Sequence, residues 1–350
     1  MAQIDPAHFH ALHDGKEVRL YELVNDLGNK VFITNFGARV VAILVPDRQG
    51  NVTDVVLGFK TLTQYISDSS YQGAAIGRFA NRIAQGRFAI DAIDFQVSTN
   101  LGSNCLHGGY TGFHNIVWEV VQYDTSLIIL SATLPDGQDG FPGNLTVHCT
   151  YSFTNDNQLI FECKAYTDQT TIVNVTQHNY FNLMGEGTGN VLDHKLTIKA
   201  SLYDAYNKEC ICEGDPSSVF DTPFDFRDRK SIGRDISLDH EQLKYGNGYD
   251  HNFHFDDFDG SVQSVAYVEA PNGITLEILT DLPCMQLYTS NWFTGDESGK
   301  SGRAYEKHAG FCLEPQLAPN APNRQGVESG LLRCGGEYRC VIIQKFGVES

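Results

Sequence analysis

Alternation of apolar and polar residues with a period of two constrains the fold of this chain most strongly. The alternation is clearest in NLTVHCTYSF, residues 144–153. One face of this segment is apolar and consists of Leu145, Val147, Cys149, Tyr151 and Phe153. Such a pattern is typical of a β-strand with one buried face. The same alternation returns at 159–165 after the turn residues 155–157, so the two segments predict a β-hairpin.

Strand-like patterns extend over most of the chain. Similar strands are predicted at 17–24, 30–46, 127–133, 172–181, 194–200, 263–269, 274–280, 284–293 and 338–346. Helical periodicity is scarce, and the best candidate is a short helix at 61–67. No linker-like composition and no repeat of fixed period divides the chain, so we expect one large antiparallel all-β domain, residues 1–350. The longest irregular stretches, 202–236 and 294–306, are expected to cover or flank a site on the sheet.

Charge and composition narrow the choice of partners and compartment. The chain has 25 Lys and Arg against 43 Asp and Glu, a formal net charge of -18, so it should repel nucleic acid and anionic membrane surfaces. It lacks an apolar run near the roughly 18 residues that cross a bilayer, and it does not start with a signal-like segment. The nine cysteines include no C-x-x-C pair and are expected to be reduced thiols. We therefore expect a cytoplasmic protein.

A histidine with polar neighbours is the first candidate for chemistry. The predicted strand 172–181 carries four polar residues on one face, Asn174, Thr176, His178 and Tyr180. A face of this kind is either solvated or forms the floor of a polar cleft. In such a cleft the imidazole of His178, which titrates near neutral pH, would suit general acid catalysis. The alternative for His178 alone is a structural, hydrogen-bonded histidine.

A glutamate at the end of another predicted strand is the second candidate. Glu314 closes HAGFCLE, residues 308–314, and its side chain should point away from those of Phe311 and Leu313. Partial burial would raise the pKa of this carboxyl group and make it a better base. The alternative is an exposed glutamate at a strand end.

Other segments supply groups that suit a ligand rich in hydroxyls. Arg82, in GRFANRIAQGRF, offers a rigid fork of donors, and Asp250, in NGYDHNF, could accept hydrogen bonds from two hydroxyls. His107 precedes two glycines that would allow the backbone to approach a ligand closely. Taken singly, Arg82 could instead form an ion pair and Asp250 could be a turn residue. Together with His178 and Glu314, these residues indicate acid/base chemistry on a sugar.

Ten segments in this order resemble the aldose 1-epimerases, also called galactose mutarotases. They are GRFANRIAQGRF (77–88), LHGG (106–109), GFHNIVWE (112–119), DGQDGFPGNL (136–145), VTQHNYFNL (175–183), DHKL (193–196), TPFDFR (222–227), GYDHNF (248–253), QLYTSNWF (286–293) and HAGFCLEPQLAPNAPN (308–323). The NRIA, YFNL and GFCLE parts are the most specific. The resemblance extends from about residue 73 to residue 323.

The resemblance implies a large antiparallel β-sandwich that binds a monosaccharide in an open cleft on a curved sheet. It implies interconversion of the α- and β-anomers of galactose, glucose or a related aldose, without a cofactor or a metal. By the matching segments, Glu314 would take the proton of the C1 hydroxyl and His178 would protonate the ring oxygen. The residues that would hold the sugar hydroxyls are Asn81, Arg82, His107, Tyr180 and Asp250.

Four positions depart from the usual pattern of the family. Asn179 stands where Ser or Val is common, His114 replaces an acidic residue, and Pro315 replaces Thr. Leu282 stands where Gln is often a sugar contact, which leaves the preferred sugar open. None of the four changes removes a proposed proton-transfer group.

Other functions remain open at this point. A glycoside hydrolase could use Asp250 and Glu314 as its two carboxylates, and a binding protein without activity could retain the same cleft. A sugar-phosphate epimerase would need a basic cluster, and near these motifs we find Arg78, Arg82 and Arg87. His251 and His254 lie beside several aspartates, but strand alternation places them on opposite faces, so no metal site is predicted.

Overall fold

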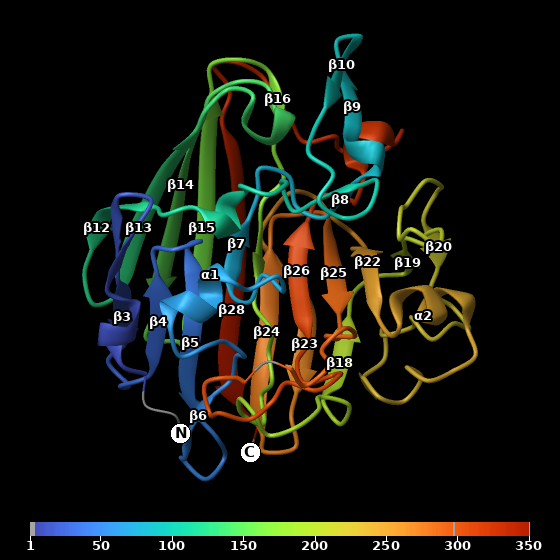
Figure 1. The fold of residues 1–350 in the computed structure, drawn as a ribbon. Coiled ribbons are helices and arrows are strands. Elements are labelled where there is room, and N and C mark those ends of the chain that lie inside the picture. The colour runs from blue at the N-terminus through green and yellow to red at the C-terminus, as the bar shows by residue number, and fades with distance from the viewer. Residues whose placement is uncertain (1–3, 297, 350) are drawn as a thin grey trace.

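A nine-stranded antiparallel sheet is the largest element of the computed structural model, which describes residues 4–296 and 298–349 (Figure 1). Its strands, in spatial order, are β12 (Glu119–Tyr123), β13 (Leu127–Leu134), β14 (Leu145–Phe153), β15 (Gln158–Thr167), β28 (Tyr338–Val348), β24 (Ile274–Thr280), β23 (Gln263–Glu269), β18 (Lys195–Ile198) and β21 (Lys230–Ser231). The predicted hairpin is confirmed, because β14 pairs with β15 in antiparallel register. The apolar face predicted for β14 is buried at every position.

Two smaller sheets and several short ladders complete the fold. A five-stranded sheet contains β20 (Ser217–Ser218), β19 (Leu202–Tyr203), β22 (Asp250–His254), β25 (Cys284–Tyr288) and β26 (Cys312–Gln316). A four-stranded sheet contains β3 (Leu20–Val24), β4 (Lys30–Thr34), β5 (Arg39–Pro46) and β6 (Val52–Asp54). The two-stranded ladders pair β1 (Ala11–His13) with β2 (Lys16–Val18), β7 (Ala74–Ile76) with β17 (Thr176–His178), β8 (Arg82–Ile83) with β11 (Cys105–Leu106), β9 (Arg87–Ile90) with β10 (Ile93–Gln96), and β16 (Thr171–Ile172) with β27 (Leu331–Leu332).

Helices are few and short, as the sequence predicts. The α-helices of the described residues are α1 (Leu62–Ile66) and α2 (Glu241–Gly246), and α1 lies inside the predicted helix 61–67. Short 3-10 helices occur at Pro6–Phe9, Ala84–Gly86, Phe113–Asn115, Gln138–Gly140 and Ala321–Asn323. None of the helices in residues 4–296 and 298–349 is long and apolar enough to cross a membrane.

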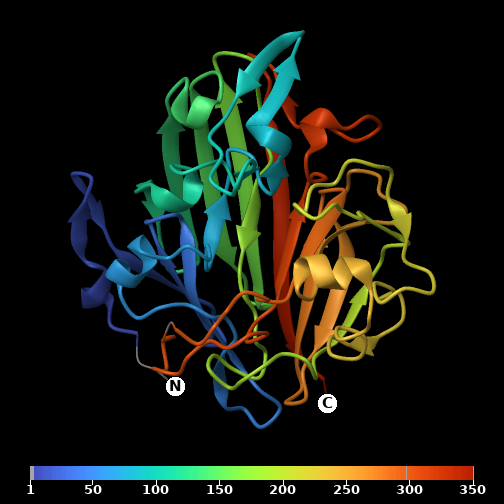
Figure 2. The same cartoon turned by 45° about the vertical axis from the view of Figure 1, so that its right-hand side comes forward.

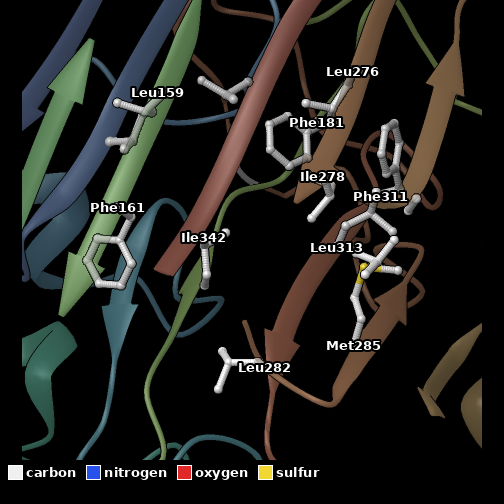
Figure 3. Close-up of a cluster of buried hydrophobic side chains, with 14 of the residues drawn as sticks. Leu159, Phe161, Phe181, Leu276, Ile278, Leu282, Met285, Phe311, Leu313 and Ile342 are labelled. Atoms are coloured by element: carbon white, nitrogen blue, oxygen red, sulfur yellow. The ribbon is translucent and has the colours of Figure 1, made fainter. Parts of the chain in front are cut away.

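The main hydrophobic core contains residues of the nine-stranded, the five-stranded and the four-stranded sheets. The two smaller sheets lie side by side over one face of the nine-stranded sheet (Figures 1 and 2). Figure 3 shows part of the core, where residues of the larger sheet meet residues of β25, β26 and the chain near them. The labelled side chains are Leu159, Phe161, Leu276, Ile278, Leu282 and Ile342, together with Phe181, Met285, Phe311 and Leu313. Because each sheet buries one face against the other, the fold is the all-β sandwich that the sequence predicts.

Register within the five-stranded sheet decides which side chains point away from the core. In β25 and β26, Leu287 pairs with Leu313 and both are buried in the core, whereas the next pair, Gln286 and Glu314, points to the opposite face. Asp250 begins β22 and lies opposite Tyr288 of β25. The polar face of this sheet therefore carries the candidate residues.

Several predicted strands differ from the structure. The segment 30–46 forms two strands, β4 and β5, the segment 17–24 is divided between β2 and β3, and the strand predicted at 284–293 ends at Tyr288. The segment 172–181 is not one strand, because residues 173–175 leave the ladder: Val173 bonds to Gly330 and Asn174 bridges to Phe79. Glu314 does not close its strand but is the central residue of β26, which explains why it is buried rather than exposed at a strand end.

Candidate active site

A cleft of about 420 Å³ opens on the polar face of the five-stranded sheet. It is within the range of about 300–1,000 Å³ that is typical of small-molecule sites. All seven residues predicted from the sequence line this cleft, namely Asn81, Arg82, His107, His178, Tyr180, Asp250 and Glu314. The fold thus brings together side chains from β8, β17, β22 and β26 and from the segments that follow β11 and β17.

His178 and Glu314 form a buried pair in this cleft. Their exposed fractions are 4% and 2%, and the Nε2 atom of His178 lies 3.6 Å from Oε2 of Glu314. This distance is longer than a direct hydrogen bond, and Oε2 has no hydrogen-bond partner among the described residues. The pair is therefore available to a group that enters the cleft.

Burial shifts the two pKa values in opposite directions. Desolvation lowers the pKa of His178 to about 4. Desolvation also raises the pKa of Glu314 well above its usual range; the nearby Asp250 carboxylate adds to this shift and Arg82 opposes it. Between these two pKa values the pair therefore holds one proton, and burial favours its location on Glu314.

The backbone of Asn81 fixes the proton of His107. The N–H group of Asn81 donates to Nδ1 of His107 at 3.2 Å, so a neutral His107 carries its hydrogen on Nε2. Both residues have positive φ values, 63° for Asn81 and 53° for His107, a conformation that costs energy outside glycine. His107 is thus held with its Nε2–H group available as a donor, next to the ring of His178 at a centroid distance of 5.3 Å.

The glycines after His107 have a different role from the one predicted. A Cβ atom on Gly108 would lie 2.3 Å from the carbonyl oxygen of Gly77, and one on Gly109 would lie 2.5 Å from the Asp139 carboxylate. These glycines allow the loop to pack against neighbouring protein segments. The structure gives no support to their predicted role in approaching a ligand.

Three side chains of the cleft lie close enough together to hold a metal ion. Ligand atoms of His107, His178 and Glu314 all lie within 4.8 Å of one another. A metal on Nε2 of His107 would force the hydrogen onto Nδ1, where it would oppose the Asn81 N–H group. This tautomer disfavours coordination, and the absence of a metal and a cofactor stays a prediction.

Asp250 is held by two neighbours. Arg82 donates from Nη2 to Oδ2 of Asp250 at 3.1 Å, and Gln286 donates from Nε2 to Oδ1 at 2.7 Å. Burial disfavours the charged guanidinium, but the Asp250 carboxylate outweighs it and the pKa of Arg82 rises. This network presents fixed polar groups on one wall of the cleft.

Gln286 is a polar cleft residue that the sequence analysis missed. It lines the cleft, whereas Leu282, the position expected to replace a sugar-binding Gln, is buried in the hydrophobic core. The concern about substrate preference at Leu282 is thus wrong. The pattern that could have identified Gln286 is strand alternation, which puts it on the same face as Tyr288. In the sheet it pairs with Glu314 of the neighbouring strand.

Aromatic rings form the remaining walls. The ring of Tyr180 stacks on His178 with centroids 5.0 Å apart, and its hydroxyl donates to the carbonyl oxygen of Ser70 at 2.8 Å. Tyr180 therefore meets a ligand mainly with its ring and with the free lone pairs of its oxygen. Tyr71 contacts His107 edge-on at 4.8 Å, and Trp292 stands at the rim with 63% of its surface exposed.

Of the two long irregular stretches, one flanks the cleft and the other does not. Thr294, Gly295, Asp296 and Tyr305 from the segment 294–306 are lining residues, as expected. The segment 202–236 contributes none, which corrects that expectation. Its strands β19 and β20 lie at the edge of the five-stranded sheet, beyond β22 in Figure 1, and its apolar side chains fill the core there.

Comparisons with known proteins agree with this architecture. A model of the aldose 1-epimerase family matches residues 19–345. The chain belongs to this family. It is 39% identical to rat galactose mutarotase over 334 residues (95% of each chain) and 38% identical to the human galactose mutarotase over 349 residues (99% of this chain and 100% of that one). It is 33% identical to the *Escherichia coli* aldose 1-epimerase over 339 residues, 96% of this chain and 97% of that one.

Solved structures show the same fold. The aldose epimerase homologue from *C. elegans* superposes with a TM-score of 0.88 at 30% identity, covering 95% of this chain and 99% of that one. Galactose 1-epimerase from *Lactobacillus acidophilus* gives a TM-score of 0.86 at 27% identity, covering 97% and 98%. Family membership confirms the resemblance seen in the motifs, and with it the prediction that the chain is an aldose 1-epimerase, a carbohydrate isomerase.

Proposed function

We propose that this aldose 1-epimerase interconverts the α- and β-anomers of galactose and glucose, with Glu314 as the base and His178 as the acid. The observation that carries the assignment of roles is the buried His178–Glu314 pair, whose facing atoms are 3.6 Å apart in the cleft. Relatives named galactose mutarotase support the choice of a hexose.

The reaction needs a proton removed from the C1 hydroxyl and a proton added to the ring oxygen, which is also bonded to C1. When the sugar binds, the one proton of the pair passes from Glu314 to Nε2 of His178. Glu314, now a carboxylate, takes the proton of the C1 hydroxyl, while the Nε2–H group of the protonated His178 gives its proton to the ring oxygen. The bond between C1 and the ring oxygen breaks, and the free aldehyde forms. Rotation about the C1–C2 bond, followed by the reverse proton transfers, closes the ring to either anomer.

The shifted pKa values fit this cycle. Ring opening converts Glu314 carboxylate and His178 imidazolium into a carboxylic acid and a neutral imidazole, the state that burial favours. Burial therefore makes His178 a strong acid and Glu314 a strong base when a sugar displaces water. General acid and general base catalysis each contribute roughly 10²–10⁴-fold.

The other polar groups of the cleft are proposed to bind the sugar hydroxyls. Arg82 and the Nε2–H group of His107 would donate, and Asp250 would accept. Asn81 and Tyr180 would complete the contacts, Tyr180 chiefly through its ring, which suits the apolar face of a sugar.

Two alternative functions are less compatible with the contacts. Both oxygens of Asp250 already accept hydrogen bonds from Arg82 and Gln286, which weakens it as the nucleophile or base of a glycoside hydrolase. For a sugar phosphate, Arg78 is occupied by the buried carbonyl oxygens of Pro142 and Gly143, and Arg87 pairs with Gln96. Of the three arginines considered, Arg82 alone lines the cleft.

Polarimetry tests the proposal. The purified chain should accelerate the loss of optical rotation of fresh α-galactose and α-glucose, and xylose and arabinose in the same assay would define the sugar preference. A nitrophenyl galactoside serves as the hydrolase control. Release of nitrophenol without mutarotation would refute the proposed function, and binding of galactose without either reaction would identify a binding protein.

We also propose a cytoplasmic location. The nine cysteines are all unpaired, and seven of them are buried, with Cys210 partly and Cys334 fully exposed. Free thiols are the usual state in a reducing compartment. Cell fractionation with an antibody to the chain would test this, and recovery outside the cytoplasm would contradict it.

A further inference from the structure

Cys312 contacts the edge of the His178 ring that faces away from Glu314. Its Sγ atom lies 3.6 Å from Nδ1 of His178, and its side chain is completely buried. Cys312 and Glu314 are two residues apart on β26, so they project from the same face of the strand. One short strand thus places a thiol at Nδ1 and a carboxyl group at Nε2 of the same imidazole.

The surroundings of His178 leave few other partners for Nδ1. Among the described residues, Glu314 is the one acidic side chain at ion-pair distance from the ring, and it faces Nε2. The rings of Tyr71, His107 and Tyr180 pack around the imidazole without a polar contact to Nδ1. Asp68 and Arg39 act from farther away with opposite signs, and the backbone carbonyl of His178 itself is the other nearby acceptor.

The proposed reaction restricts where the imidazole can carry its hydrogen. Nε2 gives its proton to the ring oxygen and must be free to take it back when the ring closes. The neutral imidazole between these steps must then keep its hydrogen on Nδ1. A neutral His178 with its hydrogen on Nε2 could not act as the acid, because the product would be an imidazolate anion.

We propose that Cys312 is a positioning residue whose Sγ accepts a hydrogen bond from Nδ1–H of His178, so that Nε2 is held toward Glu314 as the nitrogen that exchanges the reacting proton. This inference rests on the proposed function, because the requirement for Nδ1–H comes from the proton transfers. It assigns a role to a side chain that does not line the cleft.

The choice of a thiol has a chemical consequence. Sulfur is a weak acceptor, so it can orient the ring while stabilising the imidazolium little. A carboxylate at the same position would stabilise the positive charge and make His178 a weaker acid. Burial raises the pKa of the Cys312 thiol well above its usual range, so it remains neutral beside the imidazole.

Nitrogen NMR of the full chain labelled with ¹⁵N-histidine tests the inference directly. The His178 signals are assigned by their loss in His178→Asn. In the wild type at neutral pH, the nitrogen shifts should report a neutral His178 with its hydrogen on Nδ1. A wild-type spectrum with the hydrogen on Nε2 would overturn the inference.

Variants at Cys312 separate positioning from packing. Cys312→Val keeps an apolar side chain but removes the acceptor, so the two tautomers should mix and kcat should fall roughly 2- to 10-fold with little change in KM. Cys312→Ser retains an acceptor and should keep more of the Nδ1–H form than Cys312→Val. Cys163→Val, which removes another fully buried thiol, in β15, is the matched control and should leave the tautomer unchanged.

The outcomes distinguish this inference from the proposed function. Unchanged tautomer and kcat in Cys312→Val would show that the thiol only packs. If Cys312→Val fails to fold, Cys312→Ser and Cys312→Ala carry the same comparison. The tautomer is measured without sugar. If the wild type showed no mutarotase activity, the proposed function would be refuted, but the NMR result on the tautomer would still hold.

Discussion

Glu314 and His178 owe their chemistry to where strand register places them. Glu314 lies in the middle of β26, paired with Gln286 of β25, so it is buried while its side chain points to the face opposite to Leu313 and Pro315. The motifs predicted seven candidate site residues, and the structure brings all seven to the lining of one cleft, while their roles stay a prediction. Gln286 and the thiol of Cys312 could not be predicted, because their roles depend on pairing between strands that are far apart in the sequence.

The pH dependence of activity follows from the shared proton. As pH falls towards 4, His178 gains a proton while Glu314 is already protonated, so the pair holds two protons and the base is lost. As pH rises above the raised pKa of Glu314, the pair loses its single proton and the acid is lost. The profile of kcat/KM should be bell-shaped, with an acid limb near pH 4 and an alkaline limb far above the ordinary carboxyl range. An acid limb near 6.5 would contradict the burial argument.

Two neighbouring positions should separate substrate binding from stability. Gln286→Leu removes one partner of Asp250, so KM for galactose should rise roughly 10-fold while the free energy of unfolding changes little. Leu282→Ala empties part of the core and should destabilise the protein by about 2–5 kcal/mol without raising KM. Steady-state kinetics and urea unfolding check both, and a KM effect at Leu282 instead of Gln286 would refute the observed register.

At the scale of elements, a closed ring of buried side-chain amides lies on the side of β17 that faces away from the cleft. Gln177 donates to Oδ1 of Asn179, Asn179 donates to Oε1 of Gln344 in β28, and Gln344 donates back to Oε1 of Gln177, each at 2.9–3.0 Å. This explains the unusual Asn179, which faces away from the cleft and satisfies two core amides. The ring anchors the strand that ends at His178.

Breaking this ring should cost stability in a non-additive way. Asn179→Val leaves two buried amide groups short of a partner and should destabilise the protein by about 1–3 kcal/mol. Because Gln344 is one of those partners, the double variant Asn179→Val/Gln344→Leu should cost less than the sum of the two single changes. Urea unfolding measures the three values, and strict additivity would show that the amides do not act as a unit.

Segments that alternate along their whole length could be predicted well, and a segment that changes its pairing partner along the chain could not. The alternation of β14 and β15 reflects two different faces along their whole length, one of them in the core. The segment 172–181 alternates only over its first half, since Gln177 and Asn179 share the face of Val173 and Val175. Its middle residues bond to Gly330 and to the chain around Phe79 instead of to one partner strand. Nothing local to the segment reports those distant partners.

At the scale of the whole molecule, one hydrophobic cluster connects the sheets. It includes Leu23 of β3, Phe161 of β15, Leu313 of β26 and Phe346 of β28. A shared core of this kind supports the proposal that residues 1–350 form a single domain. The site depends on the same arrangement, because its strand residues come from two separate two-stranded ladders and from the five-stranded sheet.

A single domain should unfold in one step. Scanning calorimetry should give one transition with a calorimetric enthalpy close to the van't Hoff enthalpy, and fluorescence and circular dichroism should follow the same curve. Saturating galactose should move that transition to higher temperature, because a ligand of the native state stabilises it. Two resolved transitions, of which galactose shifts one, would contradict a single domain.

The most direct test of the account compares mutarotation and sugar binding in Glu314→Gln and His178→Asn. Both variants keep a polar side chain of similar size, so galactose binding measured by calorimetry should persist within a few fold. The polarimetric rate should fall by at least roughly 10²-fold in each, the contribution of one general acid or base. A rate close to that of the wild type in either variant would contradict the role assigned to that residue.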